Sequence, residues 1–281
     1  LYVGGVFSEA YGLAGNTVSV PGLARWANNT WTTVGTSAIK AMSITSAASF
    51  VAGETSTEAI MTAFGTGLAS GTDFGKTVPL PTNLLNSRVD VLDSLGTTRA
   101  AQLFFVSPGQ VNFLIPAGTA PGTATITLTA GDGSVSQGTV NVVSYSPGLF
   151  TYNANGQGVA AAVIARYKVG STTPLYESLA RYDTATSRWV TTPINLGPVG
   201  ERVFLVAYGT AFRGRASVIP VTVTMGGTVL PNVLAGASPG FVGLDQLNAE
   251  IPRSLIGRNS ELDVVLTVGT KTANTVKIFV Q

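Results

Sequence analysis

The sequence contains no cysteine and no histidine. Without cysteine the chain can form no disulfide, no thiolate nucleophile and no cysteine-based metal site. Without histidine it lacks the commonest general base and the commonest zinc ligand in proteins. We therefore predict no catalytic residue, no metal site and no cofactor, and we expect the protein not to be an enzyme.

Charged residues are also scarce, at 11% of the chain with a formal net charge of +2. Because Lys and Arg form no run, we predict no nucleic-acid partner. No segment reaches the about 18 consecutive apolar residues of a transmembrane helix, so we predict no membrane span. The low charge and the many Ser, Thr and Gly residues favour an extracellular or cell-surface location. The start at Leu1 instead of Met indicates a processed or truncated amino terminus.

Three blocks of sequence occur twice, in the same order, and predict a tandem duplication. The second block is five residues longer in the second copy than in the first. The pairs are AFGTGLA (63–69) with AYGTAF (207–212), SPGQVNFLIP (107–116) with SPGFVGLDQLNAEIP (238–252), and ITLTAGDGSVSQGTVNVV (126–143) with VVLTVGTKTANTVKIFV (264–280).

Each copy is typical of an all-β sandwich. Apolar and polar residues alternate on both sides of Asp132-Gly133, which predicts a two-stranded hairpin. Gly226-Gly227 lies between two further alternating runs and predicts another hairpin. Helical periodicity is nearly absent, and its best example, residues 158–167, fits a buried strand equally well. About 90–100 residues per copy match an immunoglobulin-like sandwich.

Several of these stretches resemble a known module. The paired SPG…N…IP blocks, the AFGT and AYGT strands, SPGLFTYNANGQGVAAAV from Ser146 and PINLGPVGERVFLVAYGT from Pro193 are similar to a carboxy-terminal module of uncharacterised secreted bacterial proteins. That module is a pair of immunoglobulin-like sandwiches of the IPT/TIG type, and the resemblance covers residues 46–281. It implies an exported protein with non-catalytic β domains and brings no catalytic residues with it.

The opening segment, through LYVGGVF and LARWANNTWTTVG, separately resembles one repeat of a bacterial β-propeller, present here in a single copy. The expected fold is therefore all-β, with two tandem immunoglobulin-like β-sandwiches and an N-terminal β-hairpin arm. The expected units are an arm at 1–45, a first sandwich at 46–150, a connector with a β-hairpin at 151–200 and a second sandwich at 201–281.

Two motifs imitate catalytic or cofactor sites. Residues 236–240 fit the G-x-S-x-G pattern of a nucleophile elbow, but Ser-Pro-Gly recurs at Ser107 and Ser146 and is interpreted as a turn. Residues 155–161 imitate a dinucleotide fingerprint, although the surrounding pattern lacks alternation of strands and helices. A glycosidase-like pair of carboxylates from distant segments stays open, and no particular pair is indicated.

Aromatic residues occur in two similar stretches. LARWANNTWTTV carries Trp26 and Trp31, and LARYDTATSRWVTT carries Tyr182 and Trp189. Both are typical of hairpins with an aromatic residue on each arm, which would stabilise the hairpin by a cross-strand contact. The alternative is a binding surface for polysaccharide or another surface protein.

The opening residues are strongly apolar, in particular Leu1, Tyr2, Val3, Val6 and Phe7. Because a lone unit of two or three strands is marginally stable, we expect this arm to cover the edge of another sheet. It could complete an upstream propeller, pack on its own sandwich, or add strands to a neighbouring molecule.

The third choice, in a head-to-tail contact that does not close, would produce a filament. The sequence thus favours a non-enzymatic structural protein that forms a homo-oligomer or homopolymer through the arm. The alternative function is a secreted adhesion module that binds polysaccharide or another surface protein.

Overall fold

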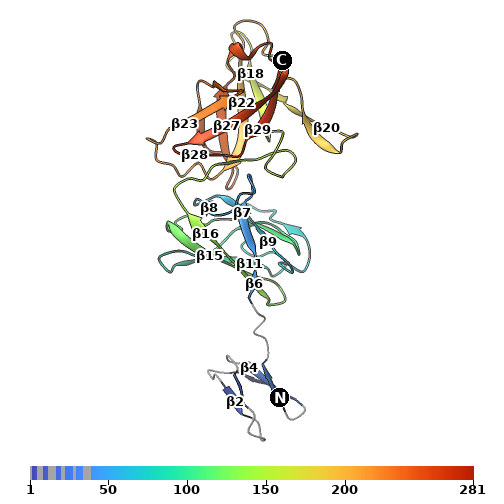
Figure 1. Cartoon of the computed structure of the whole chain (residues 1–281), viewed down its shortest axis with the longest axis vertical. Helices are drawn as coiled ribbons and strands as arrows, with labels where there is room; N and C mark the ends of the chain where they lie inside the picture. Colours follow the sequence, from blue (N-terminus) through green and yellow to red (C-terminus); the bar gives the residue numbers. More distant parts are fainter. Residues whose placement is uncertain (1, 5–8, 12–16, 20–22, 28–29, 34–38) are drawn as a thin grey trace.

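The computed structural model describes the backbone of five strands within residues 1–38 and all of residues 39–281 (Figure 1). The described parts of the first region are residues 2–4, 9–11, 17–19, 23–27 and 30–33. In the described chain the helical structure consists of one 3₁₀ turn, η1 (Arg253–Leu255), and everything else is strand or loop. None of the described helical segments has the length and apolarity to span a bilayer.

The first sandwich consists of two sheets that pack face to face around a shared core, which includes Val89, Phe113 and Ile126. One sheet has the order β10 (Asp73–Phe74), β13 (Leu103–Val106), β14 (Gln110–Leu114), β9 (Ile60–Phe64), β7 (Ser43–Ser46). The other has the order β12 (Thr98–Ala100), β11 (Arg88–Leu92), β15 (Gly122–Thr129), β16 (Val135–Val142), β6 (Lys40–Ala41), with β8 (Glu54–Thr55) also paired to β16.

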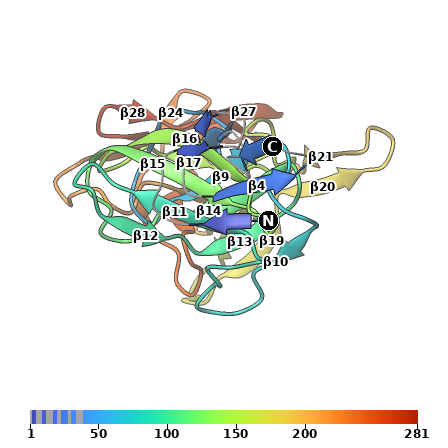
Figure 2. The ribbon, with the colours of Figure 1, turned by 90° about the horizontal axis from the view of Figure 1, so that it is seen from below.

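The second sandwich has its own core, which includes Ile164, Leu205 and Leu266. Its first sheet has the order β19 (Leu175–Ser178), β18 (Ala162–Tyr167), β22 (Arg202–Thr210), β26 (Asp245–Glu250), β25 (Leu234–Ala237), and β17 (Gly148–Leu149) also pairs with β22. Its second sheet contains β24 (Thr228–Val229), β23 (Val221–Met225) and β27 (Ser260–Val268), the last of which pairs with both β28 (Lys271–Thr272) and β29 (Val276–Val280). A separate hairpin, β20 (Ala180–Asp183) and β21 (Arg188–Thr191), projects from the side (Figures 1 and 2).

The two sandwiches have the same strand order, which confirms the duplication and the fold class. The order β13-β14-β9-β7 in the first corresponds to β25-β26-β22-β18 in the second. Likewise β12-β11-β15-β16 corresponds to β24-β23-β27-β29. Two mainly antiparallel sheets that pack face to face around one core are the immunoglobulin-like arrangement. The hairpins predicted at Asp132-Gly133 and Gly226-Gly227 are β15–β16 and β23–β24.

Much of the segment 151–200, expected to be a connector, pairs and packs with the second sandwich. β18 pairs with β22 along its whole length, with Ile164 opposite Leu205. The side chains of Ile164 and Leu179 are buried in the second core. The apolar run at 158–167 therefore contains a strand that completes a sheet, and sequence alone could not distinguish it from a helix. Similarly, β6 and β7 place residues 40–45, expected in the arm, in the first sandwich.

Within residues 1–38 the described strands pair with one another. β1 (Tyr2–Gly4), β4 (Leu23–Ala27) and β5 (Thr30–Thr33) form one sheet in the order β1-β4-β5, and β2 (Glu9–Tyr11) pairs with β3 (Thr17–Ser19). Leu1, Val6 and Phe7 of the expected arm lie outside the described residues. Of the strands described, none of β1 to β5 pairs with either sandwich.

The five extra residues of the second copy, 241–245, lie at the junction of the two sandwiches. Gly243 approaches the first sandwich so closely that a Cβ there would lie 2.6 Å from Leu114 Cδ1 and 2.7 Å from Ile60 Cγ1. Its φ of +68° is also in the region that favours glycine. The side chain of Thr210 accepts a hydrogen bond from Ile60 N at 2.9 Å and donates one to Gly243 O at 3.0 Å.

Charged groups complete this junction. Asp245 is fully buried and accepts hydrogen bonds from Phe212 N at 2.7 Å, Arg213 N at 3.1 Å and Arg213 Nε at 2.5 Å. Burial raises the pKa of Asp245, and its hydrogen bonds and the Arg213 charge oppose that rise. On β28, Lys271 forms an ion pair with Glu54 of the first sandwich. The sandwiches are thus joined by direct contacts as well as by the chain.

Candidate functional site

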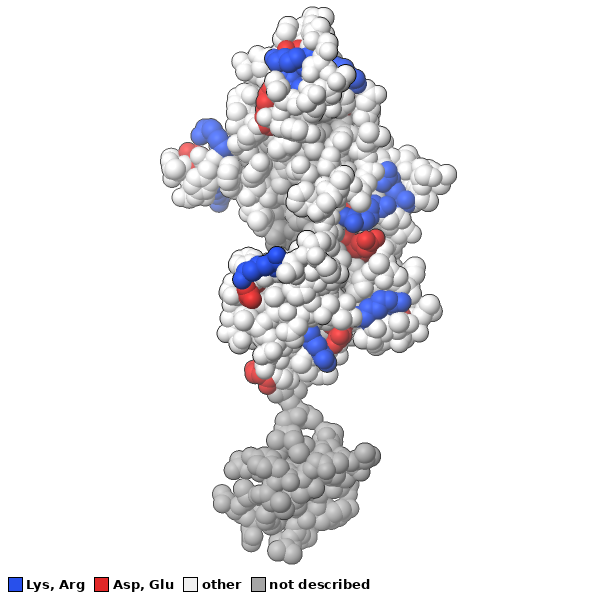
Figure 3. All heavy atoms as spheres, turned by 180° about the vertical axis from the view of Figure 1, so that it is seen from behind, with Lys and Arg blue, Asp and Glu red and all other residues white. Residues whose placement is uncertain are grey.

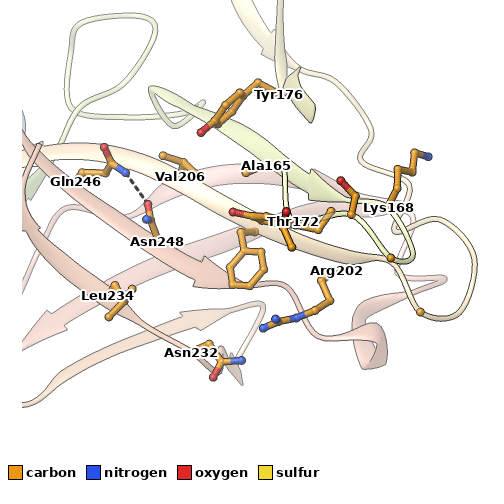
Figure 4. Close-up of a pocket in the computed structure, with 15 residues that line it drawn as sticks. Ala165, Lys168, Thr172, Tyr176, Arg202, Val206, Asn232, Leu234, Gln246 and Asn248 are labelled. Carbon is orange, nitrogen blue, oxygen red and sulfur yellow. Dashed lines mark hydrogen bonds between the residues drawn. The ribbon is translucent and has the colours of Figure 1, made fainter. Parts of the chain in front are cut away.

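A groove with a volume of about 560 Å³ runs over the outer face of the sheet that contains β18, β22, β26 and β25 (Figure 4). Its lining combines aromatic and amide side chains, namely Tyr167, Tyr176, Phe204, Asn232, Gln246 and Asn248. The volume lies within the about 300–1,000 Å³ typical of small-ligand sites.

Strand alternation explains why these side chains share a face. On β22 the side chains of Val203 and Leu205 enter the core, so Phe204 between them faces outward. On β26 Leu247 is in the core, and the neighbouring polar positions face the groove. The sheet therefore has one apolar face for folding and one mixed face that is available for contacts.

Three aromatic rings contribute to the groove. The Phe204 ring lies 5.6 Å from the Tyr167 ring in an edge-to-face arrangement, and the Arg202 guanidinium carbon lies 4.9 Å from the Phe204 centroid. Tyr176, opposite Ala165 in the sheet, is 68% exposed. In Figure 4 Tyr176 lies on the opposite side of the groove from Asn232.

The charges around the groove are neutralised by partners. Arg202 donates from Nε to Glu250 Oε1 at 3.0 Å and from Nη2 to Glu250 Oε2 at 2.8 Å, which raises the pKa of Arg202 and lowers the pKa of Glu250. Lys168 Nζ lies 2.8 Å from Glu201 Oε1, and the pKa of Glu201 is lowered by this contact. The residues that line the groove include neither Asp nor Glu.

The amide side chains form a short row of hydrogen bonds along β26. Ser238 Oγ donates to Gln246 Oε1 at 3.2 Å, and Gln246 Nε2 donates to Asn248 Oδ1 at 2.9 Å. The first sandwich has the same pair, with Gln110 Nε2 donating to Asn112 Oδ1 at 2.8 Å.

The two rows differ at one neighbouring position. In the first copy Thr62 Oγ1 also donates to Asn112 Oδ1, at 3.1 Å. The residue at this position in the second copy is Val206, opposite Asn248 in the sheet, and it has no hydroxyl. The Asn248 amide therefore keeps hydrogen-bonding capacity on the side of the groove.

The hairpin β20–β21 carries Tyr182 directly opposite Trp189, with ring centroids 5.7 Å apart in an edge-to-face arrangement. Trp189 also packs against Tyr152 at 4.8 Å. Asn153 accepts a hydrogen bond from Trp189 N at 2.9 Å and donates one to Trp189 O at 3.1 Å. Trp189 thus holds the hairpin against the sandwich, which supports the interpretation of this aromatic pair as a packing contact. Tyr182 remains 49% exposed.

Trp26 and Trp31 are opposite each other in the β4–β5 pairing. Their side chains lie outside the described part of the structure, and their strands belong to a different sheet from Tyr182 and Trp189. Trp26 and Trp31 therefore lie in one hairpin and Tyr182 and Trp189 in another, and a shared binding surface stays a prediction.

The two motifs that imitate catalytic or cofactor sites lie in turns. Ser238 begins the reversal between β25 and β26, with Ser238 N donating to Leu244 O at 2.8 Å, so the context is strand–turn–strand. Gly156 and Gly158 both have positive φ, and the strand β18 follows them where a nucleotide fold would have a helix.

Sequence reasoning missed a buried charge cluster at the end of the second sandwich farther from the junction. Arg166 on β18 is 6% exposed and donates to Glu177 Oε2 at 2.9 Å, Glu201 Oε2 at 3.1 Å and Asn195 O at 2.7 Å. These contacts lower the pKa of Glu177 and raise that of Arg166. On the face of the molecule in Figure 3, charged side chains occur as small groups of both signs.

No protein-family model and no curated protein matches the sequence. Neither the IPT/TIG resemblance nor the propeller-repeat resemblance thus gains support from a family match, and both stay predictions.

Among solved structures, a tandem of titin Ig domains A164–A165 is similar at 11% identity, with 82% of this chain and 89% of that chain covered and a TM-score of 0.24. Murine CEACAM1b is similar at 14% identity, with 85% and 100% covered and a TM-score of 0.18. The I9–I11 tandem of titin is similar at 8% identity, with 82% and 94% covered and a TM-score of 0.18. The assignment of the fold rests on the strand order described above.

Proposed function

We propose that the protein is a non-enzymatic, extracellular structural protein whose copies join into a filament by strand addition. The observation that carries this proposal is a difference between the two sandwiches at equivalent sheet edges. In the first sandwich β13 is covered by β10, whereas the equivalent strand β25 is the last strand of its sheet within the described chain.

The first sandwich provides a template for an added strand. β10 is antiparallel to β13, with Asp73 opposite Val106 and Phe74 opposite Phe105. Gly75 N also donates to Phe104 O at 2.9 Å. An extended segment that bound β25 in the same way would complete the second sheet, as in β-augmentation.

The exposed edge of β25 has few of the features that block strand pairing. Its sequence is Leu-Ala-Gly-Ala, without charge or proline, and Leu234 is 71% exposed. Arg215 Nη2 donates to Ala235 O at 2.8 Å and would give up that bond to an added strand.

The proposed donor is β1 in the arm of a second copy. β1 is at the end of the order β1-β4-β5, so its pairing with β4 uses one of its two edges. A donor at one end of the chain and an acceptor near the other give a heterologous contact, which propagates when it does not close.

A lysine on the β25 edge tests the proposal. A Cβ at Gly236 would meet no atom within 4 Å, so Gly236→Lys is compatible with the fold. We expect purified Gly236→Lys protein to remain monomeric under conditions in which the wild type forms filaments, as observed by negative-stain imaging and sedimentation. Gly236→Ala is the matched control, since it fills the same space without charge and should assemble.

Removal of residues 1–38 should abolish assembly as well. Filaments that persist after both changes, or a wild-type chain that stays monomeric at every concentration, would contradict assembly by strand addition.

Adhesion through the aromatic hairpins is a second candidate function, favoured by the 49% exposure of Tyr182 on a projecting hairpin. In this case Tyr182→Ala should reduce attachment of the protein to a polysaccharide-coated surface while assembly is unchanged. Equal attachment by the variant and the wild type would exclude Tyr182 from this role.

A further inference from the structure

We propose that the groove over β18, β22 and β26 binds a short segment of a neutral oligosaccharide without cleaving it. The groove includes Leu234 of β25 but none of the residues of the Tyr182 hairpin, and the inference does not depend on filament assembly.

The first argument is the absence of unbalanced charge in the lining. Arg202 is held in a bidentate pair with Glu250, and Lys168 is paired with Glu201. A charged ligand would have to compete with these pairs for its counter-ion. A neutral ligand leaves both pairs intact.

The second argument is the chemistry of the polar groups. A sugar hydroxyl both donates and accepts hydrogen bonds, so its best partners are groups that also do both. The amides of Asn232, Gln246 and Asn248 meet this need, and Asn248 has lost the threonine contact that its counterpart in the first sandwich retains.

The third argument is the position of the aromatic rings. The C–H face of a pyranose ring is apolar and packs on aromatic rings, whose apolar bodies carry a polar tip in the case of tyrosine. Tyr176 offers a ring that is 68% exposed beside the groove, while the Phe204 ring is held by Tyr167 and Arg202. One exposed ring and one packed ring, with amides nearby, suit a chain of pyranose units.

The lining also determines what happens to the bound sugar. Hydrolysis of a glycosidic bond by the usual route needs two carboxyl groups on either side of that bond. Because the lining residues include no carboxylate, the bound oligosaccharide is expected to be released intact.

The test is calorimetric titration of the full chain with four neutral probes, cellohexaose, maltohexaose, chitohexaose and mannohexaose, and with hexagalacturonate as a charged probe. We expect at least one neutral probe to bind and hexagalacturonate not to bind. Tyr176→Ala and Asn248→Ala should each weaken that binding at least tenfold. Phe241→Ala removes an aromatic side chain that is 65% exposed outside the groove, and it should bind as the wild type does.

The probe recovered after overnight incubation should have its original length. The proposal is overturned if none of the neutral probes binds, if hexagalacturonate binds more tightly than all of them, or if the probe is shortened. It is also overturned if both groove variants, shown by their thermal unfolding to be folded, keep wild-type affinity.

Discussion

The hydroxyl of Thr210 in the second sandwich accepts a hydrogen bond from the backbone amide of Ile60 in the first, at 2.9 Å and with no exposure of Thr210 to solvent. Thr210→Val should leave that amide and Gly243 O without their partner. An unsatisfied buried polar group costs about 1–3 kcal/mol, so we expect the free energy of unfolding to fall by that amount, as measured by urea titration.

Thr66 occupies the same position in the first copy but is exposed, and Thr66→Val is the matched control. It should change the free energy of unfolding by less than about 0.5 kcal/mol. Equal effects of the two substitutions would mean that the contact between the sandwiches adds nothing to stability.

Arg166 should be essential for the stability of the second sandwich. Its guanidinium holds Glu177 and Glu201, and the Glu201 side chain is 5% exposed. Arg166→Met leaves a buried carboxylate with fewer partners, and we expect a loss of about 3–5 kcal/mol in urea unfolding. Arg88→Met, which removes a pair with Asp90 at a side chain that is 60% exposed, should cost no more than about 1 kcal/mol.

Asp93 should make stability depend on pH in the acid range. Hydrogen bonds from Thr97 N, Ala120 N and Arg99 lower its pKa to about 2. Because the folded-state pKa lies below the unfolded value of about 3.9, its contribution is present above that value and is lost as the pH falls from about 4 to about 2. Urea unfolding between about pH 5 and pH 2 should show a weaker dependence for Asp93→Asn than for the wild type. Parallel curves for the two proteins would contradict this assignment.

Trp189 should control whether the β20–β21 hairpin is attached to the sandwich. Trp189→Ala removes the contacts with both Tyr152 and Tyr182 and should lower the free energy of unfolding by about 2–4 kcal/mol. Limited proteolysis should then cut the turn at residues 184–187 more quickly. Tyr182→Ala keeps the contact between Trp189 and Tyr152, and should cost only about 0.5–1.5 kcal/mol with little change in cleavage. An unchanged cleavage rate for Trp189→Ala would show that other contacts hold the hairpin.

The repeated blocks allowed much of the fold to be predicted because they coincide with strands at the centre of the sheets. AYGT lies on β22, AFGT begins on β9 and continues past its end at Phe64, and the Q-x-N triplets lie on β14 and β26. Each of these strands pairs with a neighbour on both sides, so its sequence alternates regularly between the core face and the outer face. Within 151–200, the sequence did not distinguish β18 from a helix because β18 has few polar residues, so its alternation is hidden although its pairing with β22 is regular.

The groove could not be predicted in the same way. Its residues come from five strands, β18, β19, β22, β25 and β26, and from the loops next to them, and only the pairing of the strands places Tyr176 and Asn248 on one sheet. One signal was available, because Gln246 and Asn248 repeat Gln110 and Asn112 at alternate positions. That pattern indicates a polar outer face. The loss of the threonine hydrogen bond at Val206, however, is recognised only when the pairings in the two sheets are compared.

The close contact of Gly243 with Ile60 and Leu114 determines whether further units could stack in the same way. In the second copy the corresponding positions are Phe204 and Glu250, opposite each other in the sheet just as Ile60 and Leu114 are. In a further copy stacked in the same manner, the corresponding glycine would contact Glu250. The ion pair between Glu250 and Arg202 would then be removed from water, which costs desolvation free energy. The second sandwich therefore does not repeat the contact surface of the first, and a unit attached beyond it would need a different contact.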